Sequence, residues 1–296
     1  LAADSGLAEA QYRLGCFYYD WAQDSTSHSE LEMYGVLGSV GDLQVQTVRY
    51  LNLAAEQGQP DAQMMLAGMY SEGFSGLQQD HNEAFRLYQL AAAEGKCPLA
   101  FQKLGLSYMS GQGVAQDEEE AVRYFKLAIE IGGVETSYIH LARAYELGTG
   151  VPQDYAEARR LYDRVRTISP WSEQWKFSIC APRFQAYRNL AELNLVGKGG
   201  PHDIPRAIEL FMLASQRQDA VSACILGSVY LKGFAHIKPN FEEAARYFKR
   251  ALACYSKFPL ESNNQKHATC TFASIHASRA LANMYENGQG VRQDLL

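Results

Sequence analysis

Histidine and cysteine are the residues of this chain best suited to bind a metal ion or to act as nucleophiles. The sequence has seven histidines and six cysteines, and they share no position in any recurring pattern. Their densest grouping consists of Cys254, His267, Cys270 and His276. The spacing of these four residues matches no standard zinc site, and the metalloprotease pattern H-E-x-x-H is absent. We therefore expect no metal site.

Motifs for nucleophilic or phosphate chemistry are missing as well. The sequence contains no G-x-S-x-G, no phosphate-binding loop and no glycine-rich dinucleotide turn. The carboxylates at Glu118–Glu120 and Glu242–Glu243 fall where helices should begin, where negative charge is favoured, and they do not form an acid/base pair. We expect neither catalysis nor a cofactor.

One stretch combines aromatic and basic residues, as interface hot spots do. Between residues 159 and 188 there are seven basic residues and two acidic ones, a local charge of +5 in a chain of net charge −6. The residues that we predict to bind a partner protein are Trp171, Trp175, Arg183, Arg188 and Arg166. Two alternatives stay open. The arginines can form a solvated helix face and pair with acidic residues in the first turns of nearby helices. The tryptophans can fill a gap between helices.

These residues are positioned by a repeat. The stretch 104–125, LGLSYMSGQGVAQDEEEAVRYF, recurs at 66–88, 141–162, 190–211 and 226–248, with partial copies at Leu14 and Leu281. Leu104 and Tyr108 share one helix face, Gly111 and Gly113 stop that helix and reverse the chain, and Asp117 caps a second helix. Each copy is therefore predicted to be an antiparallel helix pair.

The spacing of the copies predicts the fold class. The capping residues follow one another at intervals of 37, 37, 49, 37 and 54 residues, at Asp80, Asp117, Asp154, Asp203, Asn240 and Asp294. Such a period is typical of solenoids, in which helix pairs are stable only when stacked. We predict an all-α, right-handed α-solenoid of about six helix pairs, with Gly105 giving a neighbouring helix room to approach. The tyrosines at 70, 108, 145, 230 and 285 should be mostly buried.

The whole chain, residues 1–296, is interpreted as a single solenoid domain cut from a longer protein. Insertions are expected near 24–42, 167–184 and 255–271, the last two in the turns within helix pairs, where partner contacts are frequent. Residues 8–23 are expected to be the second helix of an incomplete repeat. Cys254 and Cys270 can either form a disulfide or remain two buried thiols.

Charge and composition exclude some classes of protein. A net charge of −6 argues against a general nucleic-acid binder. The sequence has no apolar run long enough to cross a bilayer. Neither property identifies a compartment.

The repeat resembles the Sel-like repeat family, a relative of the tetratricopeptide repeats. The most specific matches are GQGVAQD at 111–117, GTGVPQD at 148–154 and GQGVRQD at 288–294. The chain departs from the pattern at Asn194, where tyrosine is usual, and in GFAHIKPN at 233–240, so local turn geometry is in question there. The resemblance implies an adaptor or scaffold that binds other proteins.

Within the family, two short stretches are similar to the adaptor subunit of the ER-associated degradation (HRD) ubiquitin-ligase complex. They are AGMYSEG at 67–73 and the Trp171-Ser172-Glu173 element after Val165. This similarity implies a scaffold in the endoplasmic reticulum lumen whose partners are misfolded clients, a lectin and a membrane ubiquitin-ligase subunit. The alternative is a bacterial Sel-like repeat scaffold in signalling or envelope assembly, in the periplasm or cytoplasm.

Overall fold

The computed structural model of the chain describes residues 6–23, 40–74, 77–168, 182–216, 219–234, 237–255 and 265–289. The side chains of residues 23, 40, 168, 182, 183, 255 and 265–271 are outside this description. Over the described ranges the regular structure is helical, apart from one isolated bridge between Phe234 and Ile237.

The helices belong to two compact units. Unit 1 is Leu1–Ser137 with Thr149–Pro152, and unit 2 is Tyr138–Gly148 with Gln153–Leu296. Unit 1 holds α1 (Ala8–Gln23), α3 (Val40–Glu56), α4 (Pro60–Glu72), α5 (His81–Ala92), α6 (Pro98–Ser110) and α7 (Glu118–Gly132). Unit 2 holds α9 (Tyr155–Ile168), α10 (Pro182–Val196), α11 (Ile204–Gln216), α12 (Ala220–Lys232), α13 (Phe241–Tyr255) and α14 (Gln265–Glu286), and α8 (Glu135–Leu147) begins in unit 1 and continues in unit 2.

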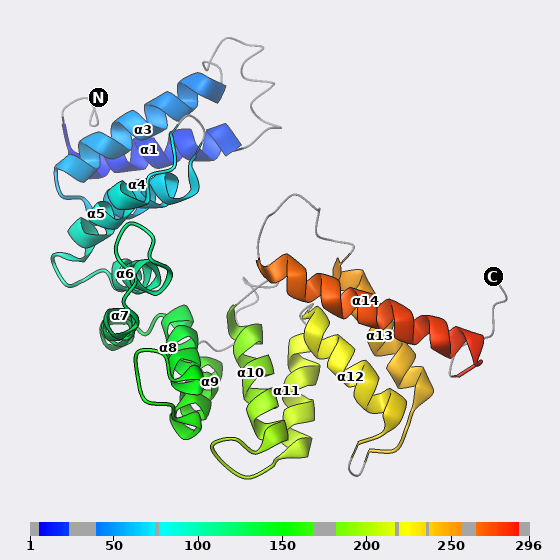
Figure 1. Cartoon of the computed structure of the whole chain (residues 1–296). Helices are drawn as coiled ribbons and strands as arrows, with labels where there is room; N and C mark the ends of the chain where they lie inside the picture. The colour runs from blue at the N-terminus through cyan, green and yellow to red at the C-terminus, as the bar shows by residue number, and fades with distance from the viewer. Residues whose placement is uncertain are drawn as a thin grey trace. The chain divides into compact units, whose positions relative to one another are not determined.

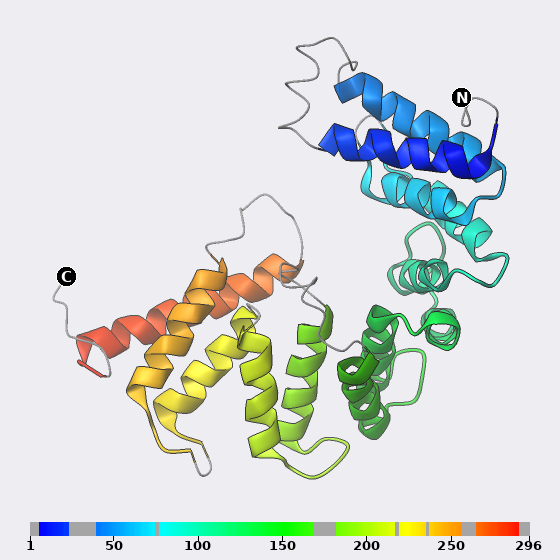
Figure 2. The same ribbon diagram turned by 180° about the vertical axis from the view of Figure 1, so that it is seen from behind.

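Consecutive helices pack in pairs within each unit (Figure 1). In unit 1, α4 packs on α5 and α6 on α7, and in unit 2, α10 packs on α11 and α12 on α13. The view from behind shows α12, α13 and α14 side by side (Figure 2). The predicted all-α helical solenoid is therefore confirmed, while its right-handed twist and the single domain over 1–296 stay predictions.

The predicted capping residues begin the second helices of the pairs. Oδ1 of Asp117 accepts a hydrogen bond from the backbone N–H of Glu120 at 3.0 Å, and its own N–H donates to the carbonyl of Tyr108 at 2.9 Å. The same two bonds recur at Asp80, Asp154, Asp203 and Asn240. Because the second bond uses only a backbone carbonyl, Asn194 replaces the usual tyrosine without changing this turn.

The two glycines of each G-x-G turn have different tasks. Gly111 ends α6 in the left-handed region at φ 69°. Gly113, at φ 77°, passes over the first residue of α5, where an added Cβ would lie 2.0 Å from the carbonyl oxygen of His81. Gly150 and Gly199 pass equally close to the starts of α7 and α9, respectively. The second glycine thus allows each turn to lie against the preceding helix pair.

The turn at 233–240 lacks that second glycine and is built differently. Phe234 and Ile237 exchange backbone hydrogen bonds of 3.0 and 2.9 Å, which close a short antiparallel bridge. Asn240 still caps α13, through the N–H of Glu243 at 3.1 Å. The departure from the repeat pattern therefore changes the turn and leaves the helix pair intact.

A large side chain of the second helix fills the centre of each pair. These fully buried side chains include Leu51, Phe125, Tyr162, Phe211 and Phe248. The first-helix glycine faces this side chain, as predicted, because a Cβ on Gly105 would lie 2.7 Å from Phe125. Gly227 has the same relation to Phe248. The repeat motif therefore specifies how closely the two helices of a pair approach.

Our assignment of residues 8–23 to a second helix is wrong. Helix α1 packs on α3, and Gly15 lies against Leu51 as Gly105 lies against Phe125. The glycine marks a first helix, so α1 and α3 form a pair joined by residues 24–39, which lie outside the described residues.

The placement of the other two insertions is also corrected. Residues 169–181 join α9 to α10, and residues 256–264 join α13 to α14. Both segments follow the second helix of a pair, so they connect successive pairs and do not lie in the turn within a pair. The insertions themselves are outside the described residues.

The repeat tyrosines are half-buried and are less enclosed than we expected. Tyr108 stacks on Tyr124 with ring centroids 5.5 Å apart, and Tyr230 stacks on Tyr247 at 5.6 Å. Residues 70, 145 and 285 belong to the same half-buried class. Each ring lies near the end of its helix, so the core covers it only in part.

Acid should destabilise the fold through His140. Burial, with the nearby charge of Arg143, lowers the pKa of His140 to about 4. An unfolded histidine has a pKa of about 6.5, so the unfolded state binds more protons as the pH falls from 6.5 towards 4. We expect the free energy of unfolding to drop by about 1.5 kcal/mol between pH 6.5 and 5 through this group. Urea titrations at both pH values should show a smaller drop for His140→Gln, and an equal drop in both proteins would exclude this cause.

Candidate protein-binding surface

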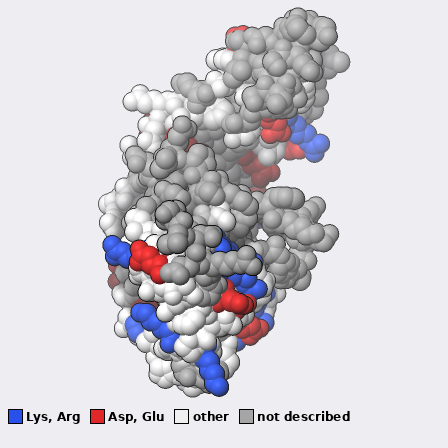
Figure 3. All heavy atoms as spheres, turned by 90° about the vertical axis from the view of Figure 1, so that its right-hand side faces the viewer, with Lys and Arg blue, Asp and Glu red and all other residues white. Residues whose placement is uncertain are grey.

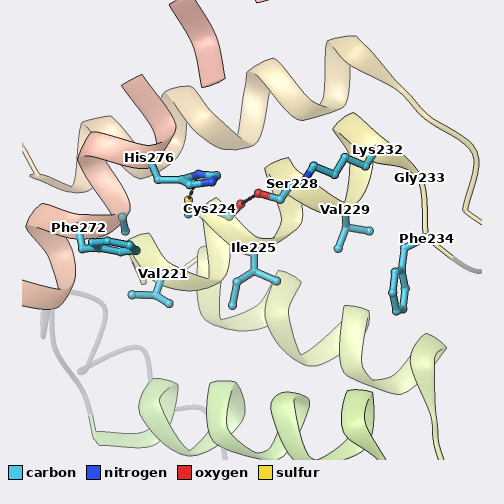
Figure 4. Close-up of a pocket in the computed structure, with 11 residues that line it drawn as sticks. Val221, Cys224, Ile225, Ser228, Val229, Lys232, Gly233, Phe234, Phe272 and His276 are labelled. Atoms are coloured by element: carbon cyan, nitrogen blue, oxygen red, sulfur yellow. Dashed lines mark hydrogen bonds between the residues drawn. The ribbon is translucent and has the colours of Figure 1, made fainter. Parts of the chain in front are cut away.

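A groove of about 450 Å³ opens in unit 2 between α12 and α14. Its lining is mostly apolar and consists of Val221, Cys224, Ile225, Ser228, Val229, Lys232, Gly233, Phe234, Phe272, Ala273 and His276. Figure 4 shows Phe272 beside Val221 at one end, and Phe234 at the other end, just beyond the C-terminus of α12. We call this surface the α12/α14 groove.

The groove exists because α12 is apolar on two faces. Ala223, Leu226 and Gly227 face the core and are buried. Val221, Ile225 and Val229 lie four residues apart on another face, are only half-buried and line the groove. A helix that is apolar all round is normally covered on all sides. The second apolar face of α12 is therefore a candidate contact surface.

Exposed aromatic and aliphatic side chains extend this apolar surface. Phe272 on α14 is 74% exposed, and Ile275 one turn later is 59% exposed. Phe234 is 43% exposed. Contiguous exposed apolar groups on a folded protein commonly mark a contact site for another molecule.

The cysteine in the groove is a neutral thiol. Sγ of Cys224 lies 3.3 Å from Nδ1 of His276, and the two residues face each other in Figure 4. Burial raises the pKa of Cys224 to about 11. A nucleophilic cysteine needs a lowered pKa, because the thiolate is the reactive form. The pair therefore lacks the lowered thiol pKa that a catalytic Cys–His dyad requires.

Alkylation should reveal this lack of activation. At pH 7.5 a thiol with a pKa near 11 is ionised to less than about one part in a thousand. We expect iodoacetamide to label Cys224 in the folded protein at least tenfold more slowly than in urea, as followed by mass spectrometry. Labelling faster in the folded protein would show an activated thiol and reopen the question of catalysis.

The predicted aromatic and arginine-rich patch is only partly visible. Trp171 and Trp175 lie outside the described residues, and so does the side chain of Arg183 in α10. Arg166 is exposed and pairs with Asp163 at 3.1 Å. Arg188 pairs with Asp219, the N-cap of α12, at 3.0 Å. The structure thus brings Arg188 to the N-terminal end of α12, where the groove begins.

Other arginines of that stretch also have partners within unit 2. Arg159 donates to the side chain of Asn194 and to the carbonyl oxygens of Lys198 and Pro201, so it connects α9 to the turn after α10. Arg160 pairs with Glu157 at 2.7 Å. Figure 3 shows basic and acidic side chains interspersed on one face of the molecule. Glu157 and Asp219, which lie outside the stretch, therefore balance two of its five net positive charges.

A hydrogen-bonded network lies close to this end of unit 2. The hydroxyl of Tyr162 donates to Glu146 at 2.9 Å and accepts from Asn189 at 2.9 Å. Burial is the main reason that the pKa of Tyr162 is raised, so the ring stays neutral. The network joins α8, α9 and α10 and needs no bound group to satisfy it.

The described residues add no sign of metal binding or of membrane insertion. Among them, no cluster of three or more His, Cys, Asp or Glu side chains is arranged to hold a metal ion. No described helix is both long and apolar enough to span a bilayer. Cys254 is buried in the core of unit 2, but the side chain of Cys270 is outside the described part, so their pairing is undecided.

Comparisons with known proteins agree with this fold. The Sel1 repeat model matches residues 8–20, 33–59, 60–96, 102–133, 136–164, 184–219, 220–255 and 275–296. The chain therefore belongs to the Sel1 repeat family, whose repeats form protein-interaction scaffolds. The search of curated proteins found no match.

Bacterial proteins are among the solved structures of similar fold. A Sel1 repeat protein from Oxalobacter formigenes is 21% identical, with 90% of each chain covered and a TM-score of 0.64. A protective antigen with an SLR fold, present in uropathogenic Escherichia coli strains, is 22% identical over 99% of this chain and 75% of its own, with a TM-score of 0.48. At these identities the likeness concerns the fold alone.

Proposed function

We propose that this protein is a non-catalytic scaffold that binds another protein through the α12/α14 groove. The observation that carries the proposal is the second apolar face of α12, which lies beside the exposed ring of Phe272. An interior helix pair of a solenoid stacks on a neighbour at each side, and α12 packs on α11, α13 and α14. The apolar side chains that stay half-buried or exposed after this packing, at Val221, Ile225, Val229 and Phe272, are the surface available to a partner. The neutral thiol of Cys224 gives no support to a catalytic role.

A matched pair of variants tests this proposal. Phe272→Asp places a negative charge in the groove at an exposed position. Val45→Asp is the control, because it places the same charge outside the groove, at a 65% exposed position of α3 in unit 1. In co-purification with quantitative mass spectrometry, a partner retained by the wild type and by Val45→Asp should be depleted at least tenfold by Phe272→Asp. Equal retention by both variants would overturn the groove as the binding site. Circular dichroism checks that both variants fold.

The cellular setting is a finer proposal. The degradation-adaptor role is supported by the two short stretches. AGMYSEG, however, coincides with the end of α4, where Gly73 ends the helix in the left-handed region at φ 73°, so the repeat turn accounts for this glycine. The Trp171-Ser172-Glu173 element lies outside the described residues. Ubiquitin-ligase or lectin subunits among the co-purified proteins would support the degradation adaptor, and bacterial signalling or envelope proteins would support the alternative.

The segment with Trp171 and Trp175 is proposed as a second contact surface. Its support is the sequence pattern together with Arg188, which lies at the start of α12. The double variant Trp171→Ala, Arg183→Ala should weaken partner binding measured on the folded protein. A lower melting temperature with unchanged affinity would show that these side chains are structural.

A further inference from the structure

The mostly apolar groove has basic side chains at its rim. Lys232 lines the groove at the C-terminal end of α12. Arg279 is exposed on α14, three residues after His276 and therefore on the same side of that helix. Within the described part of the chain, neither Lys232 nor Arg279 makes an ion pair, and no carboxylate lines the groove.

Elsewhere the repeat neutralises its own basic residues. An acidic residue three positions after the cap pairs with an arginine three positions later, as in Glu83 with Arg86 at 2.6 Å and Glu120 with Arg123 at 2.6 Å. Glu243 and Arg246 of α13 follow the same rule at 2.5 Å. The cations at the groove rim lie on first helices, which lack this internal partner.

The segment of the chain that forms the groove is also basic in composition. Residues 220–288 contain eight basic and four acidic residues, a net charge of +4 in a chain whose net charge is −6. The apolar groove therefore lies in the basic segment of an acidic protein. Complementary charge steers a partner and selects against partners of the wrong sign.

We propose that the groove binds an amphipathic helix of a partner protein that carries acidic residues beside its apolar face. The proposal rests on the protein-binding function proposed above and specifies its partner. Val221, Ile225 and Val229 repeat once per helical turn, which suits a helix whose apolar side chains follow the i, i+4, i+7 pattern. Its acidic residues would meet Lys232 and Arg279. Helix α12 has 13 residues and is about 20 Å long, so a partner helix of about four turns matches it.

Selection from a displayed library of random 16-residue peptides tests this chemistry with the whole chain as bait. We expect the enriched peptides to combine apolar residues at helical spacing with a net negative charge. In fluorescence anisotropy, Lys232→Glu, Arg279→Glu should weaken the best peptide at least tenfold. The matched double variant Lys96→Glu, Lys103→Glu changes the net charge equally at residues that do not line the groove, and it should leave the affinity within about twofold.

Each other outcome overturns the acidic-helix proposal. Enrichment of basic or uncharged peptides, or no enrichment, contradicts the partner chemistry. If the two double variants weaken the peptide equally, the peptide responds to the net charge of the protein and not to the cations at the groove rim. Self-association in sedimentation experiments that Phe272→Asp abolishes would identify a second copy of the chain as the occupant. None of these outcomes bears on the proposed scaffold function. That function is tested independently, by whether Phe272→Asp loses the co-purified partner.

Discussion

Replacing Gly113 by alanine is expected to lower the free energy of unfolding by about 3 kcal/mol or more. The new Cβ would lie 2.0 Å from the carbonyl oxygen of His81, so backbone has to move in one of the two repeats. Overpacking of this kind costs about 1–3 kcal/mol, and a left-handed conformation costs a further 1–2 kcal/mol for an L-residue. Thermal and urea denaturation followed by circular dichroism measure the loss.

Gly111→Ala is the matched control for this prediction. Gly111 is also left-handed, at φ 69°, but its added Cβ would make an ordinary 3.4 Å contact with Gln116. Only the conformational cost of about 1–2 kcal/mol should remain. If the two variants lose equal stability, contact between successive repeats is not the reason for the second glycine.

Truncation of Phe125 to alanine should be the other severe change. The ring is 1% exposed between α6 and α7, and loss of a buried phenylalanine typically costs about 3–5 kcal/mol. Phe125→Leu should cost less than about 1.5 kcal/mol, because Leu51 fills the equivalent place in the pair formed by α1 and α3.

An exposed phenylalanine provides the comparison. Phe272→Ala should change the unfolding free energy by no more than about 0.5 kcal/mol, since the ring is 74% exposed. A loss at Phe272 as large as that at Phe125 would mean that the groove is part of the core. The same urea titrations measure all three variants.

The fold was predictable because the residues that cap helices and form turns recur in the copies of the repeat. Capping by Asp117, the turn glycines and the close approach at Gly105 follow from residue type and spacing, and the structure confirms them. The order of helices around α1 was mispredicted, because residues 24–39 interrupt the period between α1 and α3. An interrupted period hides which helix of a pair comes first.

The α12/α14 groove was not predicted from the sequence. Its signal was present in α12, where apolar residues occupy both faces and exceed what one buried face requires. The aromatic and arginine-rich stretch attracted attention instead, because charge and tryptophan content are visible without a structure. Two of its arginines, Arg159 and Arg188, have partners that only the packing of α9, α10 and α12 reveals.

Hydroxyl-radical footprinting of the protein with and without its co-purified partner tests the central claim most directly. Exposed phenylalanines react readily, so Phe272 and Phe234 should lose most of their reactivity in the complex, while the exposed Phe17 of unit 1 should keep its own. Mass spectrometry of the peptides reports each position separately. If the partner protects Trp171 and Trp175 and leaves Phe272 and Phe234 unchanged, the α12/α14 groove is not the binding site.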